Sequence, residues 1–261
     1  MPEYEVVRAV TPAASVLLQD NPGPMTLDGT NTWLLRAPGS SETVVVDPGE
    51  DDPVHLDALL AAAPSIALVL VTHGHFDHSQ ASAALHARTG APVRALDPAH
   101  CHGAEPLSDG EVCSAAGVQV RVLATPGHTA DSVSFVLSDG SGDALLTGDT
   151  ILGRGTTVVA HPDGALGPYL DSLARLRDLG DVLVLPGHGP ELPSAAEVAA
   201  MYLSHRAERL DQVRVALAQL GPAATARQIV EVVYADVDES VWWAAELSVR
   251  AQLDYLRTAG S

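Results

Sequence analysis

The stretch that decides the fold is Thr72-His73-Gly74-His75-Phe76-Asp77-His78, which holds three histidines and one aspartate. It follows the apolar run 66–71, which predicts a buried strand, and it leads into a helix expected over 77–89. His73 and His75 stand two positions apart on an extended backbone, so their side chains point the same way. This junction therefore gathers imidazole and carboxylate groups, which are suitable zinc ligands.

Three further segments supply ligand-type residues in a similar context. His128, Asp149 and His188 each follow a predicted strand, and each stands next to a glycine. Ligands at the ends of neighbouring strands are typical of an open α/β site. The predicted metal ligands are His73, His75, Asp77, His78, His128, Asp149 and His188.

Seven ligands are too many for one tetrahedral ion and suit two divalent ions, about 3.5–4 Å apart, that share a solvent molecule. Asp149 is the candidate carboxylate for bridging both. Zinc is the favoured ion, with iron and manganese as alternatives, because imidazole and carboxylate suit several metals.

The rest of the chain divides into two regions. Before residue 193, predicted strands alternate with helices, which indicates an α/β layered architecture. Strands are expected at 4–18, 32–47 (a hairpin), 66–72, 92–96, 118–123, 132–138, 144–148 and 181–185, and helices at 53–63, 77–89 and 165–179. Three helices follow, at 194–219, 225–235 and 238–258. The predicted domains are 1–193, catalytic, and 194–261, small and helical.

The balance of charged residues indicates which kinds of molecule the protein is expected to bind. The chain has 33 acidic and 14 basic residues, a formal net charge of −19, and no lysine. Proteins that bind nucleic acids usually present a basic patch that releases counterions from phosphates. The sequence shows no arginine cluster of that kind. A cationic or neutral substrate is therefore expected, and a polyanion such as single-stranded RNA is disfavoured.

Cysteine content and hydropathy indicate the compartment. Cys101 and Cys113 are too few for a disulfide framework. We see no signal peptide, and the longest apolar run is too short to span a bilayer. These features predict a cytoplasmic protein without membrane association. A monomer or a homodimer is expected.

In their order and spacing, the seven residues resemble the pattern of the metallo-β-lactamase superfamily. The resemblance implies a four-layer αβ/βα sandwich with a small helical C-terminal domain. It assigns His73, His75 and His128 to one ion and Asp77, His78 and His188 to the other, with Asp149 bridging.

Segments 21–32, 148–157 and 202–206 are similar to the beta-lactamase-like subgroup, which includes a single-strand endoribonuclease and acyl-carrier thioesterases. Its members carry a winged-helix-like tail. Residues 194–261 are expected to form a truncated version of that tail, with the wing hairpin absent or cut short.

The expected activity is hydrolysis by a hydroxide bridging two metal ions. The resemblance implies a small-molecule or carrier-bound acyl substrate, namely a thioester or another acyl ester. Asp77 is expected to orient the hydroxide and to shuttle its proton. By resemblance, Asn31, Thr156 and Thr157 line the substrate pocket, and His205 is a further candidate. An aspartate at the bridging position, in place of cysteine, argues against antibiotic hydrolysis as the main activity.

Two alternatives remain open from the sequence. One is an endoribonuclease that cleaves single-stranded RNA phosphodiesters. The other is a non-catalytic metal-binding interaction module.

Overall fold

The computed structural model describes residues 2–138 and 142–259, and it divides into two compact units. The first unit comprises the chain up to Ala124, Asp131–Gly155 and Val182–Pro193. The second comprises Thr125–Ala130, Thr156–Asp181 and the chain from Ser194 onward. The division at residue 193 stays a prediction; the second unit takes in two internal segments besides the tail.

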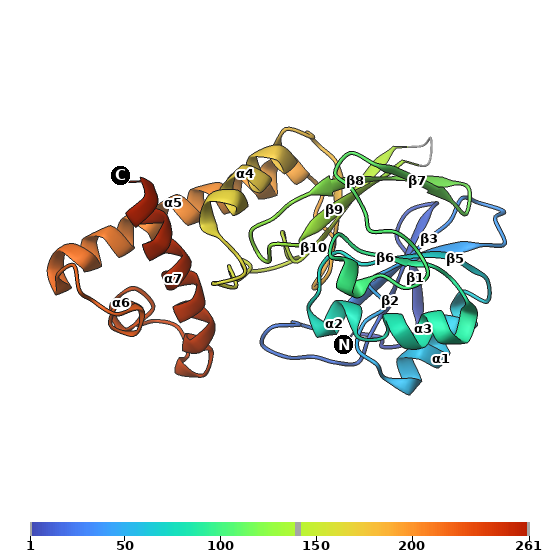
Figure 1. Cartoon of the computed structure of the whole chain (residues 1–261), viewed down its shortest axis with the longest axis horizontal. Coiled ribbons are helices and arrows are strands. Elements are labelled where there is room, and N and C mark those ends of the chain that lie inside the picture. Colours follow the sequence, from blue (N-terminus) through green and yellow to red (C-terminus); the bar gives the residue numbers. More distant parts are fainter. Residues whose placement is uncertain (1, 139–141, 260–261) are drawn as a thin grey trace. The chain divides into compact units, whose positions relative to one another are not determined.

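Two β-sheets form the centre of the first unit (Figure 1). One sheet has the order β1-β2-β3-β4-β5-β6, with β1 Val7–Ala9, β2 Ala14–Leu18, β3 Asn31–Leu35, β4 Thr43–Val46, β5 Ile66–Leu70 and β6 Val93–Arg94. The other has the order β11-β10-β9-β8-β7, with β7 Val112–Ala115, β8 Val118–Ala124, β9 Val133–Ser138, β10 Asp143–Gly148 and β11 Leu183–Pro186. The β4–β5–β6 pairs and the β10–β11 pair are parallel, and the others are antiparallel.

The sheets pack face to face because alternate residues of each strand point to opposite sides. On β5, Leu68 and Leu70 join the core between the sheets, whereas Val69 joins the core on the outer face. A strand buried on both faces has an unbroken apolar sequence, which is why 66–71 lacks polar alternation. The core between the sheets is completed by Trp33, Leu35, Val44, Val46, Val120, Val122, Phe135 and Leu146, among others.

Three helices accompany the six-stranded sheet: α1 Pro53–Ala62, α2 Phe76–Ser79 and α3 Ser82–Thr89. Leu56 and Leu59 of α1 and Leu85 of α3 pack on its outer face. The predicted caps are confirmed: the Asp52 carboxylate accepts from two backbone N–H groups of α1, and Gly90 ends α3 in a left-handed conformation.

The second unit is helical in the part of it that the structure describes, with α4 Leu166–Arg177, α5 Ala195–Leu220, α6 Ala226–Val233 and α7 Trp242–Ala259. Its core joins Val213 of α5, Ile229 of α6 and Val249 of α7. Thr225 caps α6 in a capping box with Gln228, which confirms the predicted start of that helix.

The predicted mixed α/β two-sheet sandwich with C-terminal helices is confirmed, with three local corrections. Segment 4–18 is a hairpin of β1 and β2 instead of one strand, with Pro12 in the turn. The helix predicted at 77–89 divides into α2 and α3, because Ala81 donates its backbone N–H to the Gly49 carbonyl outside the helix. Strand β7 was not predicted; only Cys113 and Ala115 on it are largely covered.

Both cysteines are free thiols, as the cysteine count predicts; Cys113 is buried and Cys101 is half-buried. Among the helices that the structure describes, none is long and apolar enough to cross a bilayer.

Phe135 fills the core between the sheets and has no exposed surface. We expect Phe135→Ala to lower the free energy of unfolding by about 3–5 kcal/mol, because it leaves a cavity between two rigid sheets. Val112→Ala is the control, since Val112 is 49% exposed, and it should change the free energy by less than about 0.5 kcal/mol. Urea denaturation measures both; equal losses would contradict this position of the core.

Candidate metal centre

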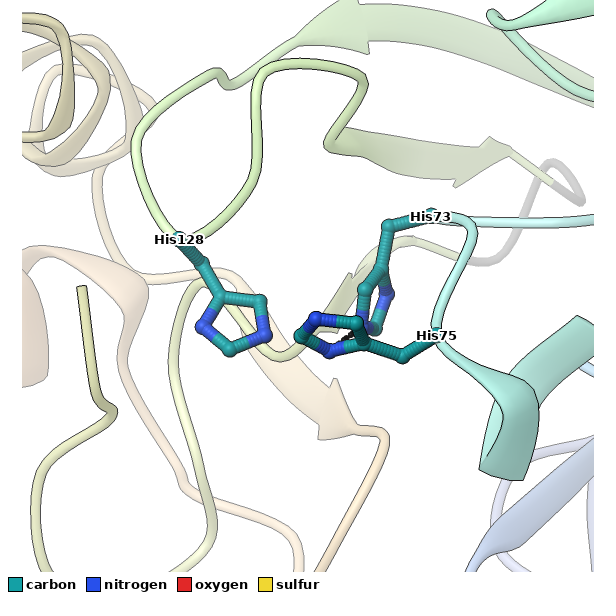
Figure 2. Close-up of side chains that lie close together, drawn as sticks. All are labelled: His73, His75 and His128. Carbon is teal, nitrogen blue, oxygen red and sulfur yellow. Dashed lines mark hydrogen bonds between the residues drawn. The ribbon is translucent and has the colours of Figure 1, made fainter. Parts of the chain in front are cut away.

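The loop between β5 and α2, together with α2 itself, carries four of the predicted ligands. Figure 2 shows His73 and His75 on this loop, with the hydrogen bond between their rings as a dashed line. The His73 Nε2 and His75 Nδ1 atoms lie 3.1 Å apart. His73, Asp77 and His78 are buried, and His75 is half-buried.

Asp47, directly after β4, organises this loop. Its Oδ1 accepts from the Thr72 backbone N–H at 2.8 Å, and its Oδ2 accepts from the Thr72 hydroxyl and from His78 Nδ1, both at 2.8 Å. Asp47 is 1% exposed, and its backbone is left-handed at φ +53°. Asp47 is not among the ligands that the sequence pattern predicts. The available signal was an acidic residue between a buried strand and Pro48-Gly49.

These hydrogen bonds fix which nitrogen of each imidazole carries the proton. The Thr72 hydroxyl donates to Asp47, so it accepts from His73 Nδ1–H at 3.0 Å. His78 Nδ1–H donates to the Asp47 carboxylate. Both rings therefore present the lone pair of Nε2. Partners that select the tautomer in this way are typical of histidines that bind metals.

His188 follows β11, an edge strand of the five-stranded sheet. Its Nδ1–H donates to the Gly29 carbonyl at 3.1 Å, so its Nε2 also presents a lone pair. The Asn31 amide donates to the Pro186 and Gly189 carbonyls at 3.0 and 2.9 Å and holds the turn that carries His188. The predicted contact of Asn31 with substrate stays a prediction.

Four donor atoms from three segments of the chain meet here, and His78 contributes one of them. Its Nε2 lies 3.1 Å from His188 Nε2, 3.4 Å from Asp149 Oδ1 and 3.6 Å from Asp77 Oδ2. His188 Nε2 lies 3.2 Å from Asp77 Oδ2 and 3.4 Å from Asp149 Oδ1. Two lone pairs and two carboxylates facing one another repel unless a cation or a proton lies among them.

The carboxylates shift the titration of these rings. Burial, the largest influence, opposes a charge on His78, but Asp149, Asp77 and Asp47 outweigh it and hold its pKa well above the usual value. The pKa of His188 is raised in the same way, against its burial, chiefly by Asp149 and Asp77. Burial also opposes a charge on Asp77, yet the neighbouring imidazoles keep the pKa of its carboxyl below the usual value.

The donor set fits a divalent metal. Within the first unit, two groups have donor atoms within 4.8 Å of one another and share His78: His73, His78 and Asp149, and Asp77, His78 and His188. Neutral imidazole and carboxylate are ligands that zinc, iron and manganese accept.

The other predicted residues belong to the second unit. His128, labelled in Figure 2, lies on the loop between β8 and β9. Its Nδ1–H donates to the Val158 carbonyl at 2.6 Å and lies 3.2 Å from the Thr157 hydroxyl. This ring also presents the lone pair of Nε2, the nitrogen that His73, His78 and His188 present. The part of His128 as a ligand stays a prediction.

Thr156 and His205 meet within the second unit, where the Thr156 hydroxyl lies 3.4 Å from His205 Nε2. Burial, followed by the positive charges of Arg206 and Arg209, lowers the pKa of His205. The buried Arg206 guanidinium donates to the Thr157 carbonyl and so orders the segment next to His128. The predicted contacts of these residues with substrate stay predictions.

A second hydrogen-bond network holds the backbone of Asp47. The Thr32 hydroxyl donates to the Asp47 carbonyl at 2.7 Å and lies 3.0 Å from His55 Nε2. His55 is fully buried, and its Nδ1 lies 2.8 Å from the Glu5 carboxylate. This chain of contacts holds the unusual backbone of Asp47.

Two protein-family models match this chain. The model of the Metallo-beta-lactamase superfamily matches residues 25–188. The model of the Beta-lactamase associated winged helix domain matches residues 225–260.

Relatives match over most of the chain. A Beta-lactamase-like protein 2 homolog of Drosophila melanogaster is 31% identical, covering 97% of this chain and 91% of its own. An Atrochrysone carboxyl ACP thioesterase of Aspergillus chevalieri is 32% identical, covering 92% and 79%. A metallo-beta-lactamase family protein of Thermus thermophilus has the same fold, with a TM-score of 0.80 at 24% identity, covering 97% and 95%.

We expect Asp47→Asn to weaken metal binding about 10–100-fold, because the amide cannot accept from His78 and Thr72 as the carboxylate does. Chelator competition measures the affinity. Asp57→Asn is the control, because the Asp57 carboxylate is exposed and pairs with Arg88 on the surface. Equal affinities in the two variants would show that Asp47 does not organise the ligands.

Metal affinity should fall as the pH falls, because protons compete for His78 and His188, whose pKa values are raised. Each competing proton weakens binding by up to about tenfold per pH unit below the raised pKa. In the metal-free protein, stability contributed by these protonated rings is present at low pH and is lost as the pH rises through their pKa values. Chelator titrations and thermal melts across the pH range test both statements; an affinity independent of pH would contradict the first.

Proposed function

This chain belongs to the metallo-beta-lactamase superfamily, and we propose that it hydrolyses a thioester or another acyl ester with two divalent metal ions, zinc being the favoured metal. The convergence of His78, His188, Asp77 and Asp149 carries the metal part of the proposal. The acyl-carrier thioesterase relative, which aligns with 92% of the chain, supports the choice of bond.

The proposed ligand sets follow the family pattern. His73, His75 and His128 would hold one ion, and Asp77, His78 and His188 would hold the other, with Asp149 as the carboxylate available to both. The positions of the ring protons support this assignment, since His73, His78, His128 and His188 all present Nε2. When bound, the two ions supply Lewis acidity to the carbonyl oxygen and lower the pKa of water.

Asp77 is the residue we propose to handle the proton. It is 7% exposed and lies beside His188, and its lowered pKa keeps it a carboxylate at neutral pH. A carboxylate at this position could accept a proton from the attacking water and return it to the departing thiolate, which is released as a thiol. It also keeps the charge of the site negative enough to hold cations.

The negative net charge of the chain favours carbonyl-ester hydrolysis over RNA cleavage. The chain carries a net charge of −19 without any lysine, and RNA binding depends on neutralising many phosphates. An endoribonuclease and a non-catalytic metal-binding module are the competing functions.

The deciding experiment assays metal-quantified protein on a panel of acyl thioesters and on labelled single-stranded RNA. We expect thioester turnover that falls at least about a hundredfold in Asp149→Ala, the scale for loss of an electrostatic catalytic group. His102→Ala is the matched control, because His102 lies outside the groups that could hold a metal among the described residues.

Each competing function has its own result. RNA cleavage that is lost in Asp149→Ala and falls steeply with added salt would replace the thioesterase proposal by the nuclease. Full metal occupancy without turnover of any substrate would favour the binding module.

A further inference from the structure

His55 is a fully buried histidine that the proposed hydrolysis does not use. It lies on α1, which packs on the outer face of the six-stranded sheet (Figure 1). Both of its ring nitrogens face polar groups: Nδ1 lies 2.8 Å from Glu5 Oε2, and Nε2 lies 3.0 Å from the Thr32 hydroxyl. These residues belong to the first unit, as does Asp47, so their positions relative to one another are defined.

The single hydrogen of the Thr32 hydroxyl decides which atoms of this network are donors. Thr32 donates it at 2.7 Å to the Asp47 carbonyl, which can only accept. The Thr32 oxygen therefore accepts from His55, so Nε2 of that ring carries a hydrogen. A carboxylate also accepts only, so the Nδ1 atom that faces Glu5 carries a hydrogen too. A histidine that donates from both ring nitrogens is an imidazolium.

The Glu5 carboxylate compensates this buried positive charge. Its Oε2 faces the His55 ring, and its Oε1 accepts from the Asp20 backbone N–H at 3.2 Å. The Glu5 backbone is left-handed at φ +57°, and its N–H donates to the Leu18 carbonyl at 3.0 Å. A buried charge is tolerated when it is paired and hydrogen-bonded. The segment before β1 thus supplies the partner that a charged His55 requires.

Asp47 connects this pair to the predicted metal ligands. Its left-handed backbone, at φ +53°, persists only where the surrounding contacts hold it. Its carbonyl accepts the Thr32 hydrogen, and its carboxylate accepts from Thr72 and His78. If His55 lacked the hydrogen on Nε2, one hydroxyl hydrogen would have to serve two acceptors, and the Asp47 carbonyl would lose its donor.

We propose that His55 is a positioning residue of the metal centre. Paired with Glu5 as an imidazolium, it directs the Thr32 hydroxyl to the Asp47 carbonyl and so fixes the carboxylate that orients His78. The ring acts through Asp47 and not on the reacting atoms. The inference rests on the proposed binding of metal and is independent of the substrate.

The protonation is tested by nitrogen NMR of the histidine rings in the full chain, with and without zinc, at neutral pH. His55→Gln identifies the signals of this ring. We expect both ring nitrogens of His55 to carry hydrogen in the wild type. In Glu5→Gln only one should do so, because a neutral amide no longer stabilises the charged ring. Glu3→Gln, which changes an exposed carboxylate nearby, is the control and should leave the spectrum unchanged.

The effect on the metal centre is measured by chelator competition. His55→Phe keeps an aromatic ring but donates no hydrogen bond. It should raise the dissociation constant of zinc about tenfold, the lower end of the range for outer partners of metal ligands. His55→Gln should restore most of the affinity, because its amide N–H can donate to Thr32. His86→Phe is the matched control, since His86 is half-buried on α3 and its Nδ1 bonds to the Ala91 carbonyl.

Thr32→Val tests the route from the ring to Asp47. It removes the hydroxyl that joins them, so it should raise the dissociation constant by itself. His55→Phe should then add little in that background, because effects of residues in one network are not additive. Thermal unfolding checks that each variant is folded.

Three results would overturn the proposal. They are a His55 ring with only one hydrogen in the wild type, unchanged zinc affinity in His55→Phe, and equal losses in His55→Phe and His55→Gln. The last would make His55 a packing residue. A chain that shows the expected spectra and affinities but hydrolyses no thioester would contradict the proposed substrate and not this inference.

Discussion

The Asp47 carboxylate is the constraint on which the metal centre depends. It accepts from the backbone and hydroxyl of Thr72 and from the ring of His78, so it joins the ends of β4 and β5 to the start of α2. A buried carboxylate needs such donors, because without them its charge would be strongly disfavoured in the interior. The donors to the Asp47 carboxylate are thus on the same segment that carries the predicted metal ligands, so the hydrogen bonds that stabilise this carboxylate also order those ligands.

The hydrogen bond made by Nδ1 of each ring decides which nitrogen faces the site. His73, His78 and His188 donate from Nδ1 to fixed oxygens and present Nε2 inward. The carboxylates of Asp77 and Asp149 lie among these nitrogens. Electron pairs concentrated in this way favour a cation, so metal binding, proton uptake and stability are linked.

Charge is used differently in the two units. The first concentrates carboxylates and imidazoles in groups that could hold a metal ion, in keeping with a chain of net charge −19. The second gathers three arginines from α6 and α7 into one pocket. Net charge bears on solubility and non-specific association, whereas the local grouping of side chains determines which charges gather at one place.

By itself, the sequence determined the ligand types, the buried strands and the helix caps at Asp52, Gly90 and Thr225. These features depend on periodicity and on residues a few positions apart, so local sequence patterns specify them. Only the tertiary structure decided that Asp47 anchors the site, which nitrogen each histidine presents and that distant arginines share a pocket. The bonds that set the tautomers of His78 and His188 join residues 31 and 159 positions apart. The pairing of β4 with β5 brings Asp47 and His78 together, and the packing of the two sheets brings Gly29 and His188 together. No local pattern in the chain specifies such pairs.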